Sequence, residues 1–168
     1  LMELIAEFID KEIDYLDEKG VRVNPIGDIS ALTPKALQSI TYAQEKTKHN
    51  SHIIFNVGLN YGGRQEILRA AKLLCEAVKD NQLQIDEIDE TLFSSYLYTA
   101  GQPDPDLVIR SSGELRISNF LLWQASYAEF YFPETLWPDF GEEAFDRAIE
   151  AYTQRDRRYG LVTDNVIE

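Results

Sequence analysis

The ten residues from Arg110 to Asn119 read R-S-S-G-E-L-R-I-S-N and bring together groups that bind phosphate. Arg110 and Arg116 each offer a planar fork of N–H donors that matches phosphate oxygens, and the serine hydroxyls can complete the shell. The whole chain is acidic, with 29 Asp and Glu against 16 Lys and Arg. A local pair of arginines in such a chain makes a diphosphate site one of two interpretations of this segment. The alternative is a solvated loop in which Glu114 pairs with one of the arginines.

A second candidate segment, N-Y-G-G-R, occupies residues 60–64. Free backbone N–H groups at the start of a helix attract anions, and Arg64 would add positive charge. The alternative is a tight strand-to-helix turn in which the two glycines only permit positive φ. Neither G-x-x-x-x-G-K nor G-x-G-x-x-G occurs in the sequence, so these nucleotide-binding fingerprints are absent.

A third candidate is Glu129, which lies in the aromatic segment Y-A-E-F-Y-F. A carboxylate among apolar side chains is costly unless it is paired or bound to a cation. Its partner can be an arginine or a hard metal ion such as Mg²⁺, which prefers oxygen ligands. The residues alone leave both possibilities open.

The elements that would position these segments alternate between strand and helix. Apolar runs bounded by turn residues predict buried strands, and apolar spacing of three and four residues predicts amphipathic helices. This order implies an α/β fold in which a parallel sheet is covered by helices on both faces. Ligands of such sheets bind beyond the carboxyl ends of the strands, where the candidate segments lie. The predicted strands are 21–26, 53–59, 107–109 and 130–132, and the predicted helices are 1–19, 33–50, 65–79, 89–98 and 140–159, the last capped by Asp139.

The length and composition are those of one globular domain spanning residues 1–168. A formal net charge of −13 disfavours non-specific binding to nucleic acid. Apolar runs fall short of a membrane span and no signal peptide is recognisable, so a cytoplasmic location is expected. The single cysteine, Cys75, excludes a cysteine-rich metal site and is expected in the core.

The chain resembles the cis-prenyltransferases, and within them the bacterial-type undecaprenyl diphosphate synthases. The resemblance extends over essentially the whole sequence and rests on an ordered set of motifs. These are N-Y-G-G-R at 60–64, D-L-V-I-R-S-S-G-E-L-R-I-S-N-F at 106–120, W-Q at 123–124, Y-A-E at 127–129, L-W-P-D-F at 136–140 and R-R-Y-G at 157–160.

The resemblance implies an Mg²⁺-dependent enzyme that condenses isopentenyl diphosphate with an allylic diphosphate such as farnesyl diphosphate, forming cis double bonds. It implies that isopentenyl diphosphate is held by Arg110, Arg116 and Ser118, with Ile117 between them. It also implies that Glu129 is an Mg²⁺ ligand. The strand before Asn60 is similar to one that lines the family's product tunnel, so the residues expected to contact the growing chain are Ile53, Phe55 and Val57.

One departure from the family pattern affects the expected activity. Family members carry a D-G-N-G-R-W-A loop, which supplies the principal catalytic Asp and the allylic site, followed by an F-S-x-E-N-W segment. Neither motif occurs in these 168 residues, and the sequence opens at Leu1 inside a helical pattern. We therefore expect a longer active protein and no activity from this chain alone. The alternatives are a non-catalytic partner subunit of a cis-prenyltransferase and, on weaker grounds, an unrelated phosphate-binding module.

A homodimer is also expected. Family members pair near the carboxyl end, and the aromatic run from Phe120 to Phe132, together with Leu136 and Trp137, exceeds what a small sheet edge would cover. Arg157, Arg158 and Gly160 are expected to reach the partner's diphosphate pocket. The alternative for these residues is a helix end neutralised within its own subunit.

Overall fold

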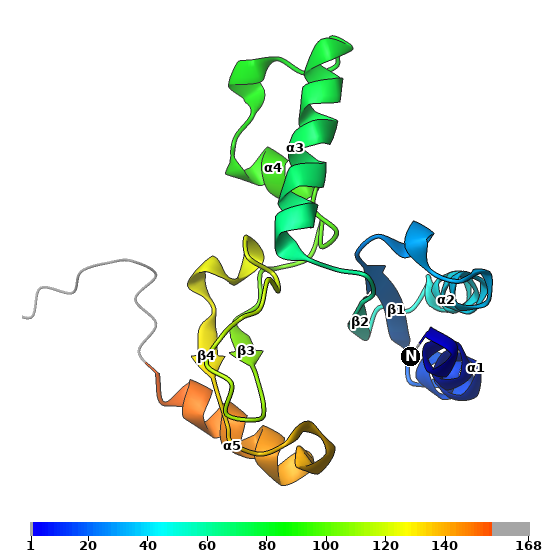
Figure 1. The fold of residues 1–168 in the computed structure, drawn as a ribbon, viewed down its shortest axis with the longest axis vertical. Helices are drawn as coiled ribbons and strands as arrows, with labels where there is room; N and C mark the ends of the chain where they lie inside the picture. Colours follow the sequence, from blue (N-terminus) through cyan, green and yellow to red (C-terminus); the bar gives the residue numbers. More distant parts are fainter. Residues whose placement is uncertain (1, 156–168) are drawn as a thin grey trace, which may run out of the picture. The chain divides into compact units, whose positions relative to one another are not determined.

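The computed structural model describes residues 2–155. The chain divides into two compact units, Leu1–Gly101 and Gln102–Glu168, and each unit is described here by itself. Both units combine helices with a two-stranded parallel sheet, which confirms the expected α/β class (Figure 1). The expectation of a single domain stays a prediction.

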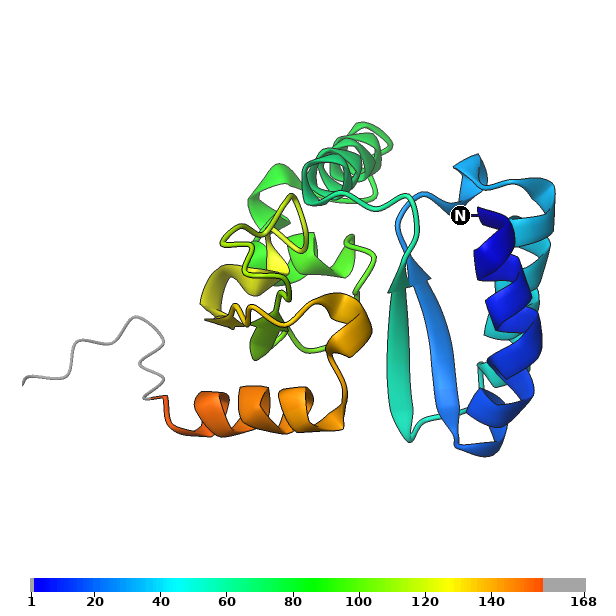
Figure 2. The ribbon, with the colours of Figure 1, turned by 60° about the horizontal axis from the view of Figure 1, so that its bottom comes forward.

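The first unit is built on strands β1 (Val21–Ile26) and β2 (Ile53–Gly58), which pair in parallel. Helices α1 (Met2–Glu18) and α2 (Pro34–Thr47) lie on the same face of this sheet (Figure 2). Helix α2 begins as the sequence predicts, because the Thr33 hydroxyl accepts a hydrogen bond from the backbone N–H of Ala36 and proline occupies the first helical position. Gly20, with φ +68°, makes the turn between α1 and β1.

The core of this unit lies between α1, α2 and β1. It is mainly apolar and includes Thr47, a fully buried residue at the end of α2 whose hydroxyl accepts a hydrogen bond from the N–H of Val23 at 2.9 Å. The same hydroxyl donates to the carbonyl of Ala43 at 2.7 Å. Helix and strand are thereby joined by a satisfied polar contact inside an apolar core. The core residues are Ile9, Ile13, Val23, Leu32, Ala36, Ile40, Ala43 and Leu59.

Strand β2 differs from the prediction of a buried central strand. Ile53, Ile54 and Phe55 are 55%, 43% and 44% exposed. Among the described residues β2 pairs with β1 alone. Ile54 lies on the face opposite to α1 and α2, which neither helix covers. Ile53 and Phe55 lie on the helix-facing side, but α1 and α2 pack mainly against β1 and leave β2 at the outer edge partly exposed. The sequence signals two apolar faces correctly, but it does not say what covers them.

Helix α3 (Gly63–Lys79) follows β2 and is joined to the chain after α4 (Glu90–Ser95) through a buried carboxylate. Glu66 is 1% exposed and accepts hydrogen bonds from the Tyr61 hydroxyl at 2.5 Å and the Tyr98 backbone N–H at 2.7 Å. Cys75, expected in the core, is exposed on this helix instead.

The second unit pairs β3 (Leu107–Ile109) with β4 (Glu129–Tyr131) in parallel, and α5 (Glu142–Thr153) contacts β4. The expected cap of the closing helix was wrong. Gly141 is the N-cap, and Asp139 belongs to a preceding 3₁₀ turn, Trp137–Asp139. Because Asp139 belongs to this turn, it cannot cap the helix. Helix α5 therefore begins at Glu142, whereas the sequence predicted a start at residue 140.

Candidate diphosphate-binding site

The segment 110–121 follows β3 and lies alongside the chain that follows β4. Three backbone hydrogen bonds hold it there. The N–H of Arg110 donates to the carbonyl of Tyr131 at 3.0 Å. The N–H groups of Ser112 and Gly113 donate to the carbonyls of Thr135 and Pro133 at 2.8 and 2.9 Å. The segment therefore begins at the carboxyl end of a parallel pair of strands, the position at which α/β sheets bind ligands.

The backbone of this segment is strained at several places. Four residues other than glycine have positive φ, namely Ser112, Ser118, Asn119 and Leu121, with φ of 73°, 47°, 64° and 46°. Such conformations cost free energy outside glycine and cluster at functional sites. Sequence reasoning missed this feature. Gly113 and Asn119 are residue types that often adopt a left-handed conformation, whereas Ser112, Ser118 and Leu121 give no such signal.

Arg110, Arg116 and Ile117 line one pocket of about 260 Å³ in the second unit. The pocket thus combines two guanidinium groups with an apolar wall, which suits a ligand that has an anionic head and a hydrocarbon body. Ser118 is exposed and is not among the lining residues. The remaining wall is made by Pro105, Leu107, Val108, Ile109, Phe120, Leu121 and Phe132.

The two arginines differ in their surroundings. Arg116 is exposed and forms an ion pair with Glu114, which is the pairing that the solvated-loop interpretation proposed. Arg110 is half-buried and its guanidinium makes no hydrogen bond or ion pair with the described residues of its unit, 102–155. An arginine without a local carboxylate keeps all its donors available for an anion.

Glu129 is the first residue of β4 and is not part of the pocket lining. Its Oε2 accepts a hydrogen bond from Arg155 Nη1 at 2.8 Å, so the arginine partner that the sequence left open is present. Oε1 of the same carboxylate has no hydrogen-bond partner within residues 2–155. No group of three or more His, Cys, Asp and Glu side chains within the described residues could hold a metal ion.

The N-Y-G-G-R segment forms a strand-to-helix turn. The residue with positive φ is Asn60, at 48°, while Gly62 is extended at −158° and Gly63 begins α3. The Asn60 side chain donates to the Asp28 carbonyl at 3.1 Å. The turn interpretation therefore holds, but asparagine rather than glycine supplies the left-handed residue.

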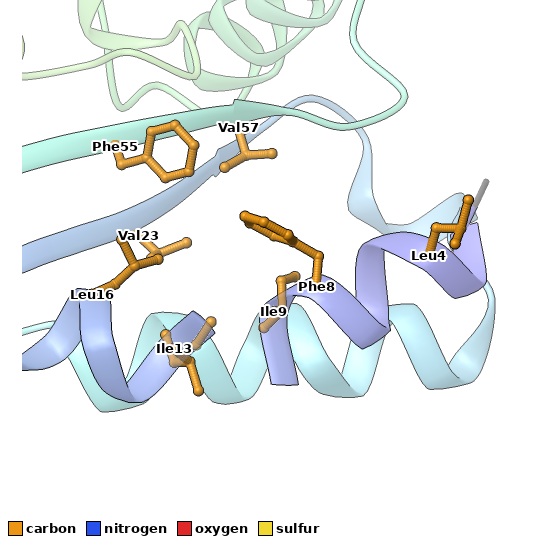
Figure 3. A pocket seen from close by; sticks show the side chains of 9 residues that line it. Leu4, Phe8, Ile9, Ile13, Leu16, Val23, Phe55 and Val57 are labelled. Carbon is orange, nitrogen blue, oxygen red and sulfur yellow. The ribbon is translucent and has the colours of Figure 1, made fainter. Parts of the chain in front are cut away.

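The first unit contains an apolar pocket of about 220 Å³ between α1 and β2 (Figure 3). Phe55 and Val57 point into it from β2, and the Phe8 side chain points toward them from α1. Ile53 is two residues before Phe55 and therefore lies on the same face of the strand, but it does not line the pocket. The complete lining is Leu4, Phe8, Ile9, Ile13, Leu16, Val23, Ala43, Phe55 and Val57.

Arg157, Arg158 and Gly160 lie outside the described residues.

No described helix is long and apolar enough to cross a membrane.

Comparison with known proteins identifies relatives along nearly the whole chain. A family model described as undecaprenyl diphosphate synthase matches residues 1–160. An isoprenyl transferase from Clostridium perfringens is 51% identical over 95% of this chain and 63% of its own length. A (2E,6E)-farnesyl-diphosphate-specific ditrans,polycis-undecaprenyl-diphosphate synthase from Micrococcus luteus is 47% identical over 95% and 64%. The chain therefore spans less than two thirds of these relatives.

A solved structure shows the same fold. It is the crystal structure of lavandulyl diphosphate synthase from Lavandula x intermedia in complex with dimethylallyl diphosphate, which superposes with a TM-score of 0.91. The two proteins share 36% sequence identity, and the match covers 95% of this chain and 69% of the other.

Proposed function

Because this chain belongs to the undecaprenyl diphosphate synthase family, we propose that the full-length protein condenses isopentenyl diphosphate units onto an allylic diphosphate of the farnesyl type. The product is a long cis-polyprenyl diphosphate. The observation that carries the proposal is the pocket of the second unit, where two arginines open onto an apolar wall. Isopentenyl diphosphate has the matching chemistry, with an anionic diphosphate joined to a short hydrocarbon.

Each pocket residue has a role in this proposal. Arg110 and Arg116 bind the diphosphate oxygens through charge-assisted hydrogen bonds, and Arg116 shares or exchanges its contact with Glu114 as the ligand enters. Ile117 contacts the hydrocarbon. The Ser118 hydroxyl donates to a phosphate oxygen after a rotation of its side chain. Binding in a fixed orientation places the double bond of isopentenyl diphosphate for attack on the allylic carbon.

We propose Glu129 as a ligand of Mg²⁺. A carboxylate is a hard oxygen donor, and Mg²⁺ in proteins commonly binds one or two carboxylates, with water and substrate phosphate completing its shell. The open Oε1 of Glu129 suits this arrangement. Bound Mg²⁺ supplies positive charge that stabilises the departing diphosphate. Glu129 would hold the cation through its Oε1.

The apolar pocket of the first unit is proposed as part of the wall that receives the growing chain. Phe55 and Val57 line it, with Phe8 opposite, and its lining contains no charged side chain. A polyprenyl chain is pure hydrocarbon beyond its head group, so burial against such a wall removes apolar area from water. Ile53, on the same face of β2, would extend the wall toward the start of the strand.

A homodimer is proposed from the apolar surface of the second unit. Leu136 is 58% exposed, Trp137 73% and Phe145 50%. Large exposed apolar side chains are typical of interfaces when they form a contiguous patch, and we propose that these residues do so. Sedimentation of the full-length protein at micromolar concentration tests this, because a fully active monomer would contradict it.

Incorporation of labelled isopentenyl diphosphate with farnesyl diphosphate and Mg²⁺ tests the activity. We expect turnover by the full-length protein and none by the 168-residue chain, which lacks the D-G-N-G-R segment. EDTA-sensitive turnover by the purified short chain would contradict the second expectation. A full-length protein that binds a catalytic homologue but lacks turnover would instead support the partner-subunit alternative.

A further inference from the structure

Arg155 makes two separate contacts with β4, in addition to the contacts that join α5 to this strand. Its Nη1 donates to Glu129 Oε2 at 2.8 Å, and its Nη2 donates to the carbonyl of Phe130 at 2.9 Å. The Arg155 backbone N–H in turn donates to the Tyr152 carbonyl at 3.0 Å, directly after the end of α5. One guanidinium therefore bridges a carboxylate and the main chain of the adjacent residue.

We propose that Arg155 is a positioning residue that presents the Glu129 carboxylate to a divalent cation. This inference rests on the proposed function, in which Glu129 is the metal ligand. Arg155 occupies Oε2, and no hydrogen-bond donor within residues 2–155 occupies Oε1. Because its second nitrogen is held by the Phe130 carbonyl, the carboxylate is fixed relative to the strand instead of rotating freely.

The geometry requires an arginine, not merely a positive charge. The guanidinium is planar and its two nitrogens are rigidly spaced, so it can serve the carboxylate and the carbonyl together. A lysine has one nitrogen on a flexible chain and would pair with Glu129 without fixing its orientation. Groups that orient a metal ligand typically contribute 10- to 100-fold to metal affinity or activity.

Simple electrostatics predicts the opposite change in metal affinity when Arg155 is lost. Removing a positive charge close to a cation site favours cation binding, so loss of Arg155 would tighten metal binding if the arginine merely competed for Glu129. The direction of the change therefore distinguishes positioning from competition. A purely structural ion pair would lower thermal stability and leave metal affinity unaltered.

The test measures Mn²⁺ binding to the full-length protein by electron paramagnetic resonance, with Mn²⁺ alone as the probe. For Arg155→Gln we expect the Mn²⁺ dissociation constant to rise by about 10- to 100-fold, and for Arg155→Lys a smaller rise. Arg147→Gln is the matched control, because Arg147 lies exposed on the same helix, α5. Its Nη1 is 3.9 Å from Oε2 of Glu143, so it forms only a loose surface ion pair. That variant removes the same charge and should bind Mn²⁺ as the parent does.

Two further results separate this inference from the proposed function. If Glu129→Gln weakens Mn²⁺ binding while Arg155→Gln leaves it unchanged or tightens it, the positioning role is wrong and the metal-ligand assignment stands. If Glu129→Gln has no effect on Mn²⁺ binding, the metal-ligand assignment is wrong and the role of Arg155 falls with it. A melting curve for each variant verifies that the protein is folded at the assay temperature.

Discussion

Replacing Arg110 with alanine in the full-length protein is expected to raise the KM for isopentenyl diphosphate and to lower kcat/KM. The guanidinium of Arg110 is half-buried beside an apolar wall and has no competing partner among residues 102–155. Little must be broken before it binds a phosphate oxygen, so nearly the whole interaction with the ligand is lost in the variant.

The structure also sets the relative size of the effect at Arg116. A hydrogen bond to a charged group contributes about 1.5–3 kcal/mol, which corresponds to roughly 12- to 140-fold in kcat/KM at about 1.4 kcal/mol per factor of ten. Arg116 is exposed and already paired with Glu114. An exposed pair of this kind contributes up to about 1 kcal/mol, so Arg116→Ala should cost up to roughly fivefold less than Arg110→Ala.

Steady-state incorporation of labelled isopentenyl diphosphate at saturating farnesyl diphosphate measures both variants. Arg147→Ala, which removes an exposed arginine of α5, serves as the control and should retain parental kinetics. Unchanged kinetics for Arg110→Ala would remove this residue from the site. A larger loss at Arg116 than at Arg110 would refute the reasoning from their different surroundings.

Three further changes concern the first unit. Thr47→Val keeps the shape of the side chain but leaves the buried Val23 N–H without its acceptor, so urea denaturation should show a loss of about 1–3 kcal/mol. Phe8→Ala enlarges the apolar pocket, and chromatography of the products should show longer chains; an unchanged distribution would exclude Phe8 from the product wall. Burial raises the pKa of Tyr98 above its ordinary value of 10.0, so stability present below pH 10.0 should be lost as pH rises through the folded-state pKa. Melting temperatures between about pH 9 and 11.5 should fall less steeply for Tyr98→Phe, and parallel curves would contradict this assignment.

The local signals in the sequence were sufficient for most elements. Thr33 before a proline marked the start of α2, and the apolar spacing and turn residues located β1, β2 and β3. The arginine-rich segment after β3 indicated a candidate phosphate site by its residue types alone. These features depend on interactions among neighbouring residues, which the order of residue types specifies directly.

Contacts between distant residues were decided only by the tertiary structure. The sequence placed Glu129 among aromatics and left its partner open, and the fold then brought Arg155, 26 residues away, to its carboxylate. Likewise, Arg110 and Arg116 are equivalent candidates by residue type, whereas folding left Arg110 half-buried and Arg116 exposed. The ion pair of Arg116 with Glu114 is a local contact, which the sequence had already suggested. The exposure of β2 has the same origin. Whether an apolar strand is buried depends on which other elements pack against it, and its own residues do not specify those elements. Residue type determines what a side chain can bind, and the fold determines which partner reaches it.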